Sequence, residues 1–193
     1  MKERDLLLWD FVTLFNAFWY RDFPISEQYK PWGSRVEWTT HFGLIVRACA
    51  DAMGFFTYFE SGGRTDAIIK DNQRNHIAHL EWEWTEAFSP KVNEIQKLLK
   101  QNDKTLFSVF ISYSEDSLLE KNLQRIAEQW QNCPNPLLVF LVIFSKQGNR
   151  RDFKTLNTYL VRDGVPEPLR SQQALPWNVE GSRWQSIKEH SAT

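Results

Sequence analysis

The chain has 193 residues, of which 42% are apolar, and it carries a formal net charge of −1. This length suits one domain with an appended tail, and the apolar share is enough for a buried core. The near-zero charge gives no global basic signature, so charge alone does not support nucleic-acid binding, although a local basic rim is compatible with it.

Cysteine use and hydropathy indicate a cytoplasmic protein. Cys49 and Cys133 have no Cys-x-x-Cys spacing and are predicted to be idle thiols in a reducing compartment. No apolar run reaches roughly 18 residues, the length of a membrane span. The first residues lead into an aromatic amphipathic segment and not into a signal-peptide core. We therefore expect a soluble, cytoplasmic protein without a membrane partner.

Two helices are predicted at the start of the chain. Apolar residues recur at helical spacing over residues 6–20. Ser34 and Glu37 then have the spacing of a capping box, with Ser34 as the N-cap residue. They open a second predicted helix over residues 35–53, which ends at Gly54.

The pattern then changes from helical to extended spacing. Residues 55–60, 64–70 and 76–84 are β-prone segments separated by short polar turns. Connections this short predict an antiparallel meander of three strands.

The next part alternates helices and strands. A helix is predicted over residues 90–101, a strand over 105–113, and a helix over 114–132 with Ser114 as its N-cap. Residues 137–144 form a continuous apolar run, which is typical of a central strand covered on both faces. The strand–helix–strand unit predicts parallel pairing of its two strands.

Residues 153–161 add a further candidate strand. From residue 163 onward, prolines and polar residues predict an extended tail, held to the body by Trp177 and Trp184. The predicted fold class is α/β, a mixed central sheet flanked by helices, with an N-terminal helix and an extended C-terminal tail. The predicted divisions are 1–33 (helix and connection), 34–162 (core domain) and 163–193 (tail packed on the core).

Three acids occupy the second and third strands of the predicted meander. Asp66 lies on the second strand, whereas Glu81 and Glu83 are two residues apart on the third and so share a face. Neighbouring strands lie roughly 5 Å apart, which brings Asp66 beside Glu81 in the right register. Clustered carboxylates repel each other unless a cation is present, so a divalent-metal site is predicted. The alternative is a solvent-facing strand whose acids balance nearby basic residues.

In such a site, Asp66 and Glu81 would hold Mg²⁺ or Mn²⁺, with the Trp82 carbonyl and waters completing the octahedron. The metal would lower the pKa of a bound water and stabilise charge on a phosphate. Glu83 would take a second metal or orient the attacking water. His79 shares the strand face of Glu81 and is a candidate base or ligand, with a structural role as the alternative.

This arrangement resembles the PD-(D/E)xK nuclease superfamily, which has the restriction-endonuclease-like fold. The resemblance covers about residues 34–145: a helix, a meander carrying the acids, and a helix–strand–helix–strand unit. Asp66 matches the motif aspartate, Glu81 matches the motif glutamate, and Glu83 stands where the usual lysine would be. The resemblance implies a magnesium-dependent endonuclease, a hydrolase of phosphodiester bonds, with DNA as the expected substrate.

Glu83 removes the usual cation, although some restriction enzymes of the superfamily carry Glu at this place and remain active, and a lysine from the following helix could supply the ammonium instead. Lys91 is the first candidate and Lys97 the alternative. The resemblance also implies Glu37, on the first core helix, as a further metal ligand. The alternative is that Glu37 only completes the capping box.

Among the clusters of basic residues, two are candidates for binding phosphate: Arg64 with Arg74, and Lys146 with Arg150 and Arg151. In a nuclease they would hold the phosphate backbone, whereas the alternative is ordinary surface charge. The resemblance also raises a homodimer, because many nucleases that cut both strands are dimers.

Two other functions stay open. A catalytically inactive nuclease-like scaffold, acting as a protein-interaction module, fits Glu83 and the aromatic load of nine tryptophans and fourteen phenylalanines. An acid-lined enzyme acting on a small molecule would instead have a closed pocket and no groove for a duplex.

Overall fold

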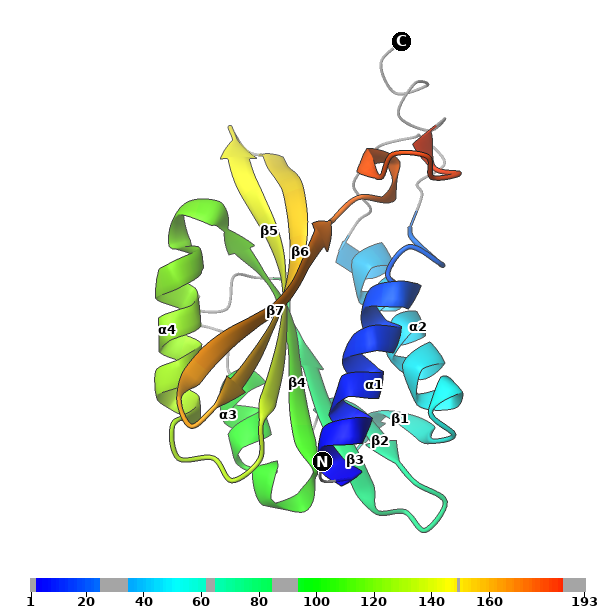
Figure 1. The fold of residues 1–193 in the computed structure, drawn as a ribbon, viewed down its shortest axis with the longest axis vertical. Helices are drawn as coiled ribbons and strands as arrows, with labels where there is room; N and C mark the ends of the chain where they lie inside the picture. The colour runs from blue at the N-terminus through cyan, green and yellow to red at the C-terminus, as the bar shows by residue number, and fades with distance from the viewer. Residues whose placement is uncertain (1–2, 25–34, 62–64, 85–93, 149, 186–193) are drawn as a thin grey trace.

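The computed structural model describes residues 3–24, 35–61, 65–84, 94–148 and 150–185, which form an α/β fold around one seven-stranded mixed sheet (Figure 1). The helices are α1 (Glu3–Phe18), α2 (Arg35–Ala52), α3 (Glu94–Leu99) and α4 (Leu119–Trp130). The strands are β1 (Phe56–Ser61), β2 (Thr65–Lys70), β3 (His76–Trp82), β4 (Phe107–Glu115), β5 (Leu137–Gln147), β6 (Arg150–Arg162) and β7 (Val165–Gln173). No helix within these ranges is long and apolar enough to cross a membrane.

The strands lie in the sheet in chain order, from β1 to β7. The first three pair antiparallel, β3, β4 and β5 pair parallel, and the last three again pair antiparallel. Helices α3 and α4 lie in the two long connections that parallel strands need. The predicted meander and the parallel β4–β5 pairing are confirmed, as is a mixed sheet flanked by helices.

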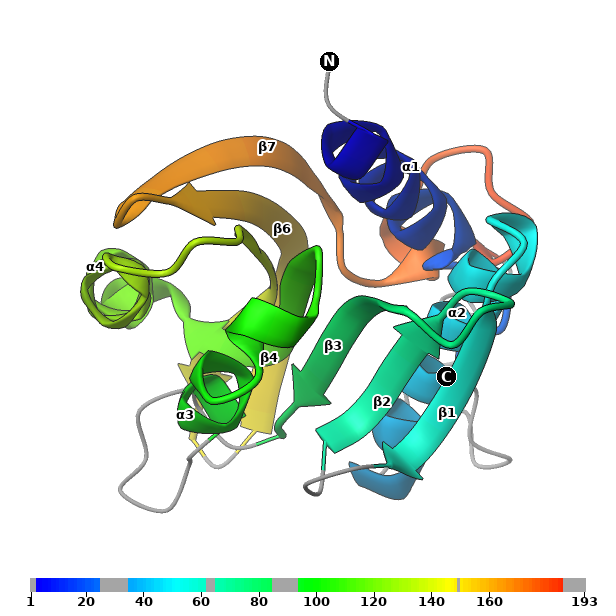
Figure 2. The ribbon, with the colours of Figure 1, turned by 90° about the horizontal axis from the view of Figure 1, so that it is seen from below.

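Helices α1 and α2 cover one face of the sheet, and α3 and α4 cover the other (Figures 1 and 2). Each face has its own apolar cluster. Successive residues of β4 enter different clusters, Val109 on the α1–α2 side and Phe110 on the α3–α4 side, because side chains alternate along a strand. The two faces of one strand are therefore buried against different helices.

An aromatic cluster joins the first two helices to the sheet. Phe15 of α1 packs on Phe140 of β5 with 4.0 Å between the ring centroids. Trp19 donates a hydrogen bond from Nε1 to the carbonyl of Ala174 at 2.8 Å. Both of these α1-side aromatics are fully buried, so this cluster forms much of the core on the α1–α2 side.

The C-terminal part differs from the prediction. We predicted an extended tail from residue 163, but Val165–Gln173 pairs with β6 as the edge strand β7. Asp163 and Gly164 join the two strands, both at positive φ (50° and 74°). Two adjacent residues at positive φ are the signature of a tight hairpin turn whose twist matches that of the strands. The Asp-Gly pair is a hairpin signal that the proline content obscured.

Pro166 and Pro168 are compatible with β7 because an edge strand needs hydrogen bonds on one side only. Beyond β7, Trp177 is buried and Trp184 packs against the larger apolar cluster. These two tryptophans therefore pin the C-terminal segment to the body, as predicted.

The predicted N-cap at Ser114 is wrong. Ser114 lies in β4, where its hydroxyl accepts a hydrogen bond from Asn122 Nδ2 at 2.9 Å. Helix α4 begins later, at Leu119, after a 3-10 turn over Asp116–Leu118. The serine supports the helix from inside the sheet and does not cap it. Ser34, the cap of the predicted capping box, lies outside the described residues.

Candidate active site

The hairpin of β2 and β3 brings Asp66 and Glu81 together. Its antiparallel register pairs Ala67 with Leu80, so continuation by one residue sets Asp66 opposite Glu81. Asp66 Oδ2 also accepts a hydrogen bond from the backbone N–H of Trp82 at 2.8 Å. The Asp66 carboxylate is thus held at the end of β3, beside Glu81, as the acid pattern predicted.

Glu81 is fully buried, and its charge partner comes from α3. The Glu81 side chain is 0% exposed, and Lys97 Nζ lies 3.1 Å from Glu81 Oε2. The same ammonium lies 3.3 Å from Glu94 Oε1, three residues earlier on α3. Lys97 therefore links two acids that come from different elements of the fold.

Two carboxylate oxygens of this cluster lack a donor. Within the described ranges, Glu81 Oε1 and Glu94 Oε2 are buried and no hydrogen-bond donor reaches them. A buried acceptor without a partner is unfavourable, and the large majority of buried polar atoms in proteins have one. A hard cation binds carboxylate oxygens, so the cluster fits a divalent metal ion chemically.

Burial makes these acids hard to ionise. Burial, reinforced by the charge of Asp66, raises the pKa of Glu81 to about 8, and Lys97 only partly opposes this shift. Burial also raises the pKa of Asp66, although the Trp82 hydrogen bond and the Lys97 charge partly lower it. Burial opposes the charge on Lys97, but its hydrogen bond to Glu81 raises the pKa overall. A divalent cation beside the two carboxylates would favour their charged forms.

A metal ion would find two carboxylates here and few other side-chain ligands. In the part of the chain that the structure describes, no three or more His, Cys, Asp or Glu side chains are arranged to hold a metal ion. Mg²⁺ bound by one or two carboxylates usually keeps several waters, so Asp66 and Glu81 are a sufficient pair. Glu37 lies in the first turn of α2 and does not line the cavity beside these acids. Its role as a ligand stays a prediction.

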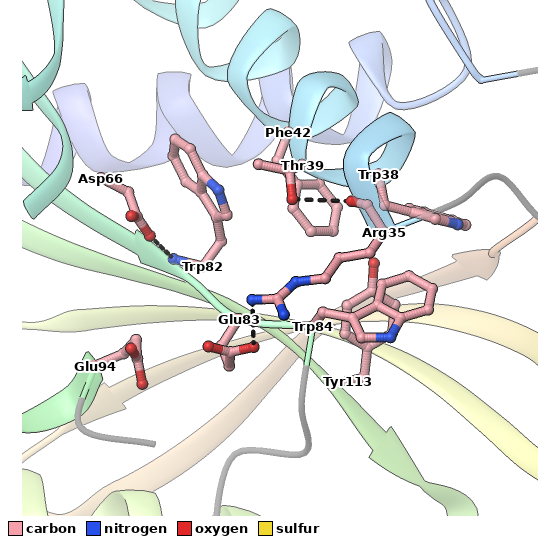
Figure 3. Close-up of a pocket in the computed structure, with 10 residues that line it drawn as sticks. All are labelled: Arg35, Trp38, Thr39, Phe42, Asp66, Trp82, Glu83, Trp84, Glu94 and Tyr113. Carbon is pink, nitrogen blue, oxygen red and sulfur yellow. Dashed lines mark hydrogen bonds and ion pairs between the residues drawn. The ribbon is translucent and has the colours of Figure 1, made fainter. Parts of the chain in front are cut away.

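A cavity of about 170 Å³ lies beside the acids (Figure 3). Arg35 of α2 reaches into it, with Nη2 3.7 Å from Glu83 Oε1. Glu83 follows the end of β3, and its carboxylate faces Arg35 in the cavity. The cavity walls combine acids and aromatic rings, among them Asp66, Glu83, Glu94, Trp82 and Tyr113.

The structure bears on the choice of lysine. Lys91, the first candidate, lies outside the described residues, and its role stays a prediction. Lys97, the alternative on the same predicted helix, contacts Glu81 directly. Among the described lysines, Lys97 is therefore our candidate to supply the cation that is missing at position 83.

The predicted nucleic-acid-binding residues lie in different environments. Arg64 and the side chain of Arg150 lie outside the described residues. Arg74 is exposed on the turn between β2 and β3. Lys146 Nζ lies 2.6 Å from Glu115 Oε2, in an exposed ion pair. Phosphate binding by these residues stays a prediction.

The Arg151 side chain packs among aromatic rings of the domain. Its guanidinium carbon lies 4.8, 5.2 and 4.6 Å from the ring centroids of Trp84, Tyr113 and Phe144. Nη1 donates a hydrogen bond to the Trp84 carbonyl at 3.0 Å. These contacts hold the chain just after β3 against the sheet, so we leave Arg151 out of the nucleic-acid surface proposed below.

Two buried histidines, His41 on α2 and the candidate ligand His79 on β3, have structural partners. His41 Nδ1 lies 3.0 Å from the Asp22 carbonyl, and burial lowers the pKa of His41 to about 4. His79 Nε2 lies 2.7 Å from His76 Nδ1, and burial followed by the charge of His76 lowers the pKa of His79 to about 4. Both rings are neutral near physiological pH, which leaves Lys97 as the cation that contacts Glu81.

Glu94 and Tyr113 were not predicted as site residues. Glu94 had a usable signal, because its i,i+3 spacing from Lys97 puts both side chains on one helix face. Tyr113 had none, because β4 is distant in sequence and only the sheet topology brings its end beside the acids.

Comparisons with known proteins add little to this site. No family model and no curated protein matches the chain. The YaeQ protein from Pseudomonas syringae is similar in structure at 14% identity and a TM-score of 0.34, covering 66% of this chain and 74% of that one. The YaeQ protein from Xanthomonas axonopodis pv. citri is similar at 12% identity and a TM-score of 0.31, covering 68% and 78%. These TM-scores are too low to assign a fold family or a function.

Proposed function

We propose that this chain is a metal-dependent nuclease with a restriction-endonuclease-like core, and that it hydrolyses phosphodiester bonds in nucleic acid, with DNA as the expected substrate. The observation that carries the proposal is the buried Glu81 carboxylate, which lies beside Asp66 and Lys97 and has an oxygen without a donor. Ionisable groups whose pKa is strongly shifted by burial and by a charged partner are concentrated at functional sites.

The order of elements supports the fold part of the proposal. Helix α2, the meander β1–β2–β3, helix α3 and strand β4 follow each other as in the resemblance, with β3 parallel to β4. The two acids lie near the start of β2 and near the end of β3, at the same end of these two antiparallel strands. Strands β6 and β7 extend the sheet beyond β5, away from the two strands that carry the acids.

Each of the three groups has a proposed role. Asp66 and Glu81 would hold Mg²⁺ or Mn²⁺, which when bound lowers the pKa of a coordinated water and stabilises the charge on the phosphate. Hydrolysis forms a bond between the water oxygen and phosphorus, breaks the bond to the leaving oxygen, and transfers a proton to that oxygen. Lys97 positions Glu81 through the 3.1 Å contact and keeps a positive charge beside the reacting phosphate.

A cleavage assay tests the proposal. The full chain is incubated with end-labelled single-stranded and duplex DNA in Mg²⁺ or Mn²⁺, beside Asp66→Asn and Glu81→Gln purified in the same way. We expect metal-dependent cleavage by the wild type and a loss of roughly 100-fold or more in each variant. Glu167→Gln, an exposed acid on β7, is the matched control and should cleave normally.

The role of Lys97 has its own test. Lys97→Ala should reduce cleavage by roughly 100-fold, because the positioned cation is lost, while Lys97→Arg should keep part of the rate. Normal cleavage by Lys97→Ala would remove Lys97 from the mechanism and return Lys91 to first place.

The second candidate function is an inactive scaffold that acts as a protein-interaction module. Lys97 already contacts Glu81 without a metal, and Glu83 brings a carboxylate to the position where the nuclease superfamily has its usual lysine. If wild-type protein and Glu81→Gln give equal background cleavage in every metal, the nuclease proposal is wrong and the scaffold is favoured.

A further inference from the structure

Two large aromatic side chains on β1 are exposed. Phe56 is 54% exposed and Tyr58 is 41% exposed, although both lie in a strand of the sheet. They are two residues apart and so point to the same side. Helix α2 packs on the other side of β1, and Figure 2 shows it behind this strand. The exposed rings thus lie on the side of the sheet away from α2.

The sheet register places these rings in line with the acids. Tyr58 pairs with Ile68 of β2, and Phe56 pairs with Lys70. Asp66, Ile68 and Lys70 are alternate residues of β2 and share one face. Lys70 Nζ lies 5.2 Å from the Tyr58 ring centroid, which places the lysine and the ring on the same face.

Positive charge collects at the end of this face farthest from the acids. Lys104 comes from the turn after α3, and the next residue, Thr105, donates a hydrogen bond to the Ile77 carbonyl at 2.9 Å, which places this turn beside the start of β3. Lys70 and Lys104 lower the pKa values of His76 and His79, after the larger effect of burial and, for His79, after the charge of His76. His79 is neutral near physiological pH as a result, and the pKa of His76 is lowered in the same direction. The face therefore runs from two lysines, past two exposed aromatic rings, to Asp66 and Glu81.

The length of this face matches a short piece of nucleic acid. Asp66 and Lys70 are four residues apart, which is about 13 Å along a strand. Stacked bases rise roughly 3.4 Å each, so about four bases span this distance. Aromatic side chains that accept stacked bases beside a basic track are the common means of binding single strands.

We propose that this face of β1–β2–β3 binds a single-stranded part of the nucleic-acid substrate, with Tyr58 and Phe56 stacking on bases and Lys70 and Lys104 contacting phosphates. The inference rests on the nuclease function proposed above and names its substrate class. A duplex fits less well, because its bases are already stacked on each other and present no free ring faces. The strand would run from the lysines toward Asp66 and Glu81.

A second copy of the chain is a less favourable occupant of this face. A two-fold contact would bring Lys70 toward its own symmetry mate, and like charges repel. The free edge of β1 is also interrupted, because Glu60 has a positive φ of 48° and no partner in the β1–β2 register between Phe59 and Ser61. Such an irregularity hinders edge-to-edge pairing.

Fluorescence anisotropy tests the inference. A labelled 12-nucleotide single strand and the matching duplex are titrated with the full chain in EDTA, which separates binding from cleavage. We expect Tyr58→Ala and Phe56→Ala each to weaken single-strand binding by roughly 10-fold, and the duplex to be affected little. Tyr58→Phe keeps the ring and should bind normally. Val165→Ala, at a 63% exposed valine on the opposite edge strand, is the matched control.

Salt dependence tests the lysines separately. Lys70→Gln and Lys104→Gln should each reduce the slope of log affinity against log salt by about 0.7, the value for one phosphate of a single strand. An unchanged slope in both variants would show that neither lysine contacts a phosphate.

Three outcomes would overturn the inference. Equal binding by wild type and both alanine variants would show that the two rings do not take part in binding. Equal weakening for single strand and duplex would make the surface non-selective. A change of oligomeric state in Tyr58→Ala by analytical ultracentrifugation, without a change in DNA binding, would assign the face to a second copy. Cleavage by the wild type together with any of these outcomes would leave the nuclease function standing.

Discussion

The two faces of strand β3 are equally buried and have opposite chemistry. Leu80 and Glu81 are neighbours in sequence, and both are 0% exposed. Leu80 points into the apolar cluster under α1 and α2. Glu81 points toward α3, where it forms an ionic cluster with the half-buried Lys97 and with Glu94. One strand thus carries the core on one side and the candidate active site on the other.

The difference indicates which face stabilises the fold and which face serves a function. Burial of apolar side chains contributes favourable free energy in proportion to the area removed from water. Burial of a carboxylate is unfavourable even when it is paired, and a well-packed apolar residue is often as stable or more so. We infer that the α1–α2 side of β3 stabilises the domain, whereas Glu81 on the α3 side lowers its stability, and under the proposed function this carboxylate would bind a cation.

The largest effect is expected on the apolar face. Phe15→Ala removes a fully buried ring that packs on Phe140, and we expect the free energy of unfolding to fall by about 3–5 kcal/mol. Urea denaturation of the full chain measures this. Leu6→Ala, on the same helix at a 46% exposed position, is the control and should change stability little. Similar losses in both variants would show that the face does not act as a core.

The opposite face should respond to pH. The pKa of Glu81 is raised to about 8 in the folded protein from an unfolded value near 4.5, so the folded state holds this proton more tightly. The contribution of Glu81 is therefore fully present below about pH 4.5 and is lost as the pH rises through about 8. Glu81→Gln cannot ionise and should lack this loss, on the order of a few kcal/mol.

The measurement is the free energy of unfolding of wild type and Glu81→Gln at several pH values without divalent metal. Their difference should grow in favour of the variant from pH 5 to pH 8. Lowered pKa values of His41 and His79 act in the opposite direction between about pH 4 and 6.5, but they are common to both proteins and cancel. A difference that stays constant with pH would contradict the raised pKa of Glu81.

A smaller effect is expected at Arg151, which packs on rings of the α1–α2 cluster just beyond the end of β3. Arg151→Gln removes a guanidinium from three aromatic rings and a hydrogen bond to the Trp84 carbonyl. We expect a loss of about 1–2 kcal/mol in the free energy of unfolding and an unchanged salt dependence of DNA binding. A reduced salt slope with normal stability would restore Arg151 as a phosphate-binding residue.

The smallest effect is expected far from both faces of β3. Lys146→Gln breaks an exposed ion pair with Glu115, and exposed pairs in high dielectric contribute little. Its denaturation midpoint should equal that of the wild type within error. A clearly lower midpoint would mean that exposed ion pairs contribute more to the stability of the domain than we expect.

The elements that sequence periodicity predicted well are those with local signals. The meander β1–β3 and the apolar run of β5 were read correctly, because alternation and short polar turns depend on neighbouring residues only. Strand β7 was missed because Pro166 and Pro168 argue against a strand unless it is known to lie at an edge. Position in the sheet is a property of the whole fold and is absent from the local pattern.

The candidate site was predictable to a similar degree. The proximity of Asp66 and Glu81 follows from the strand period and a short hairpin, so the residue pattern was enough. The choice between Lys91 and Lys97 depends on where α3 lies against β3, and no local pattern specifies that. The burial of Glu81 could likewise not be predicted, because two acids spaced i,i+2 are also typical of a strand whose one face lies in solvent.

The binding of Mn²⁺ tests the central claim most directly. Electron paramagnetic resonance of Mn²⁺ titrated with the full chain at about pH 8 reports the fraction of bound ion. We expect one ion to bind to the wild type and to Glu167→Gln, and binding to be lost in Asp66→Asn and Glu81→Gln, because two carboxylates hold the ion. If the wild type binds no Mn²⁺, or if the two site variants bind it as tightly as the wild type, Asp66 and Glu81 are not a metal site.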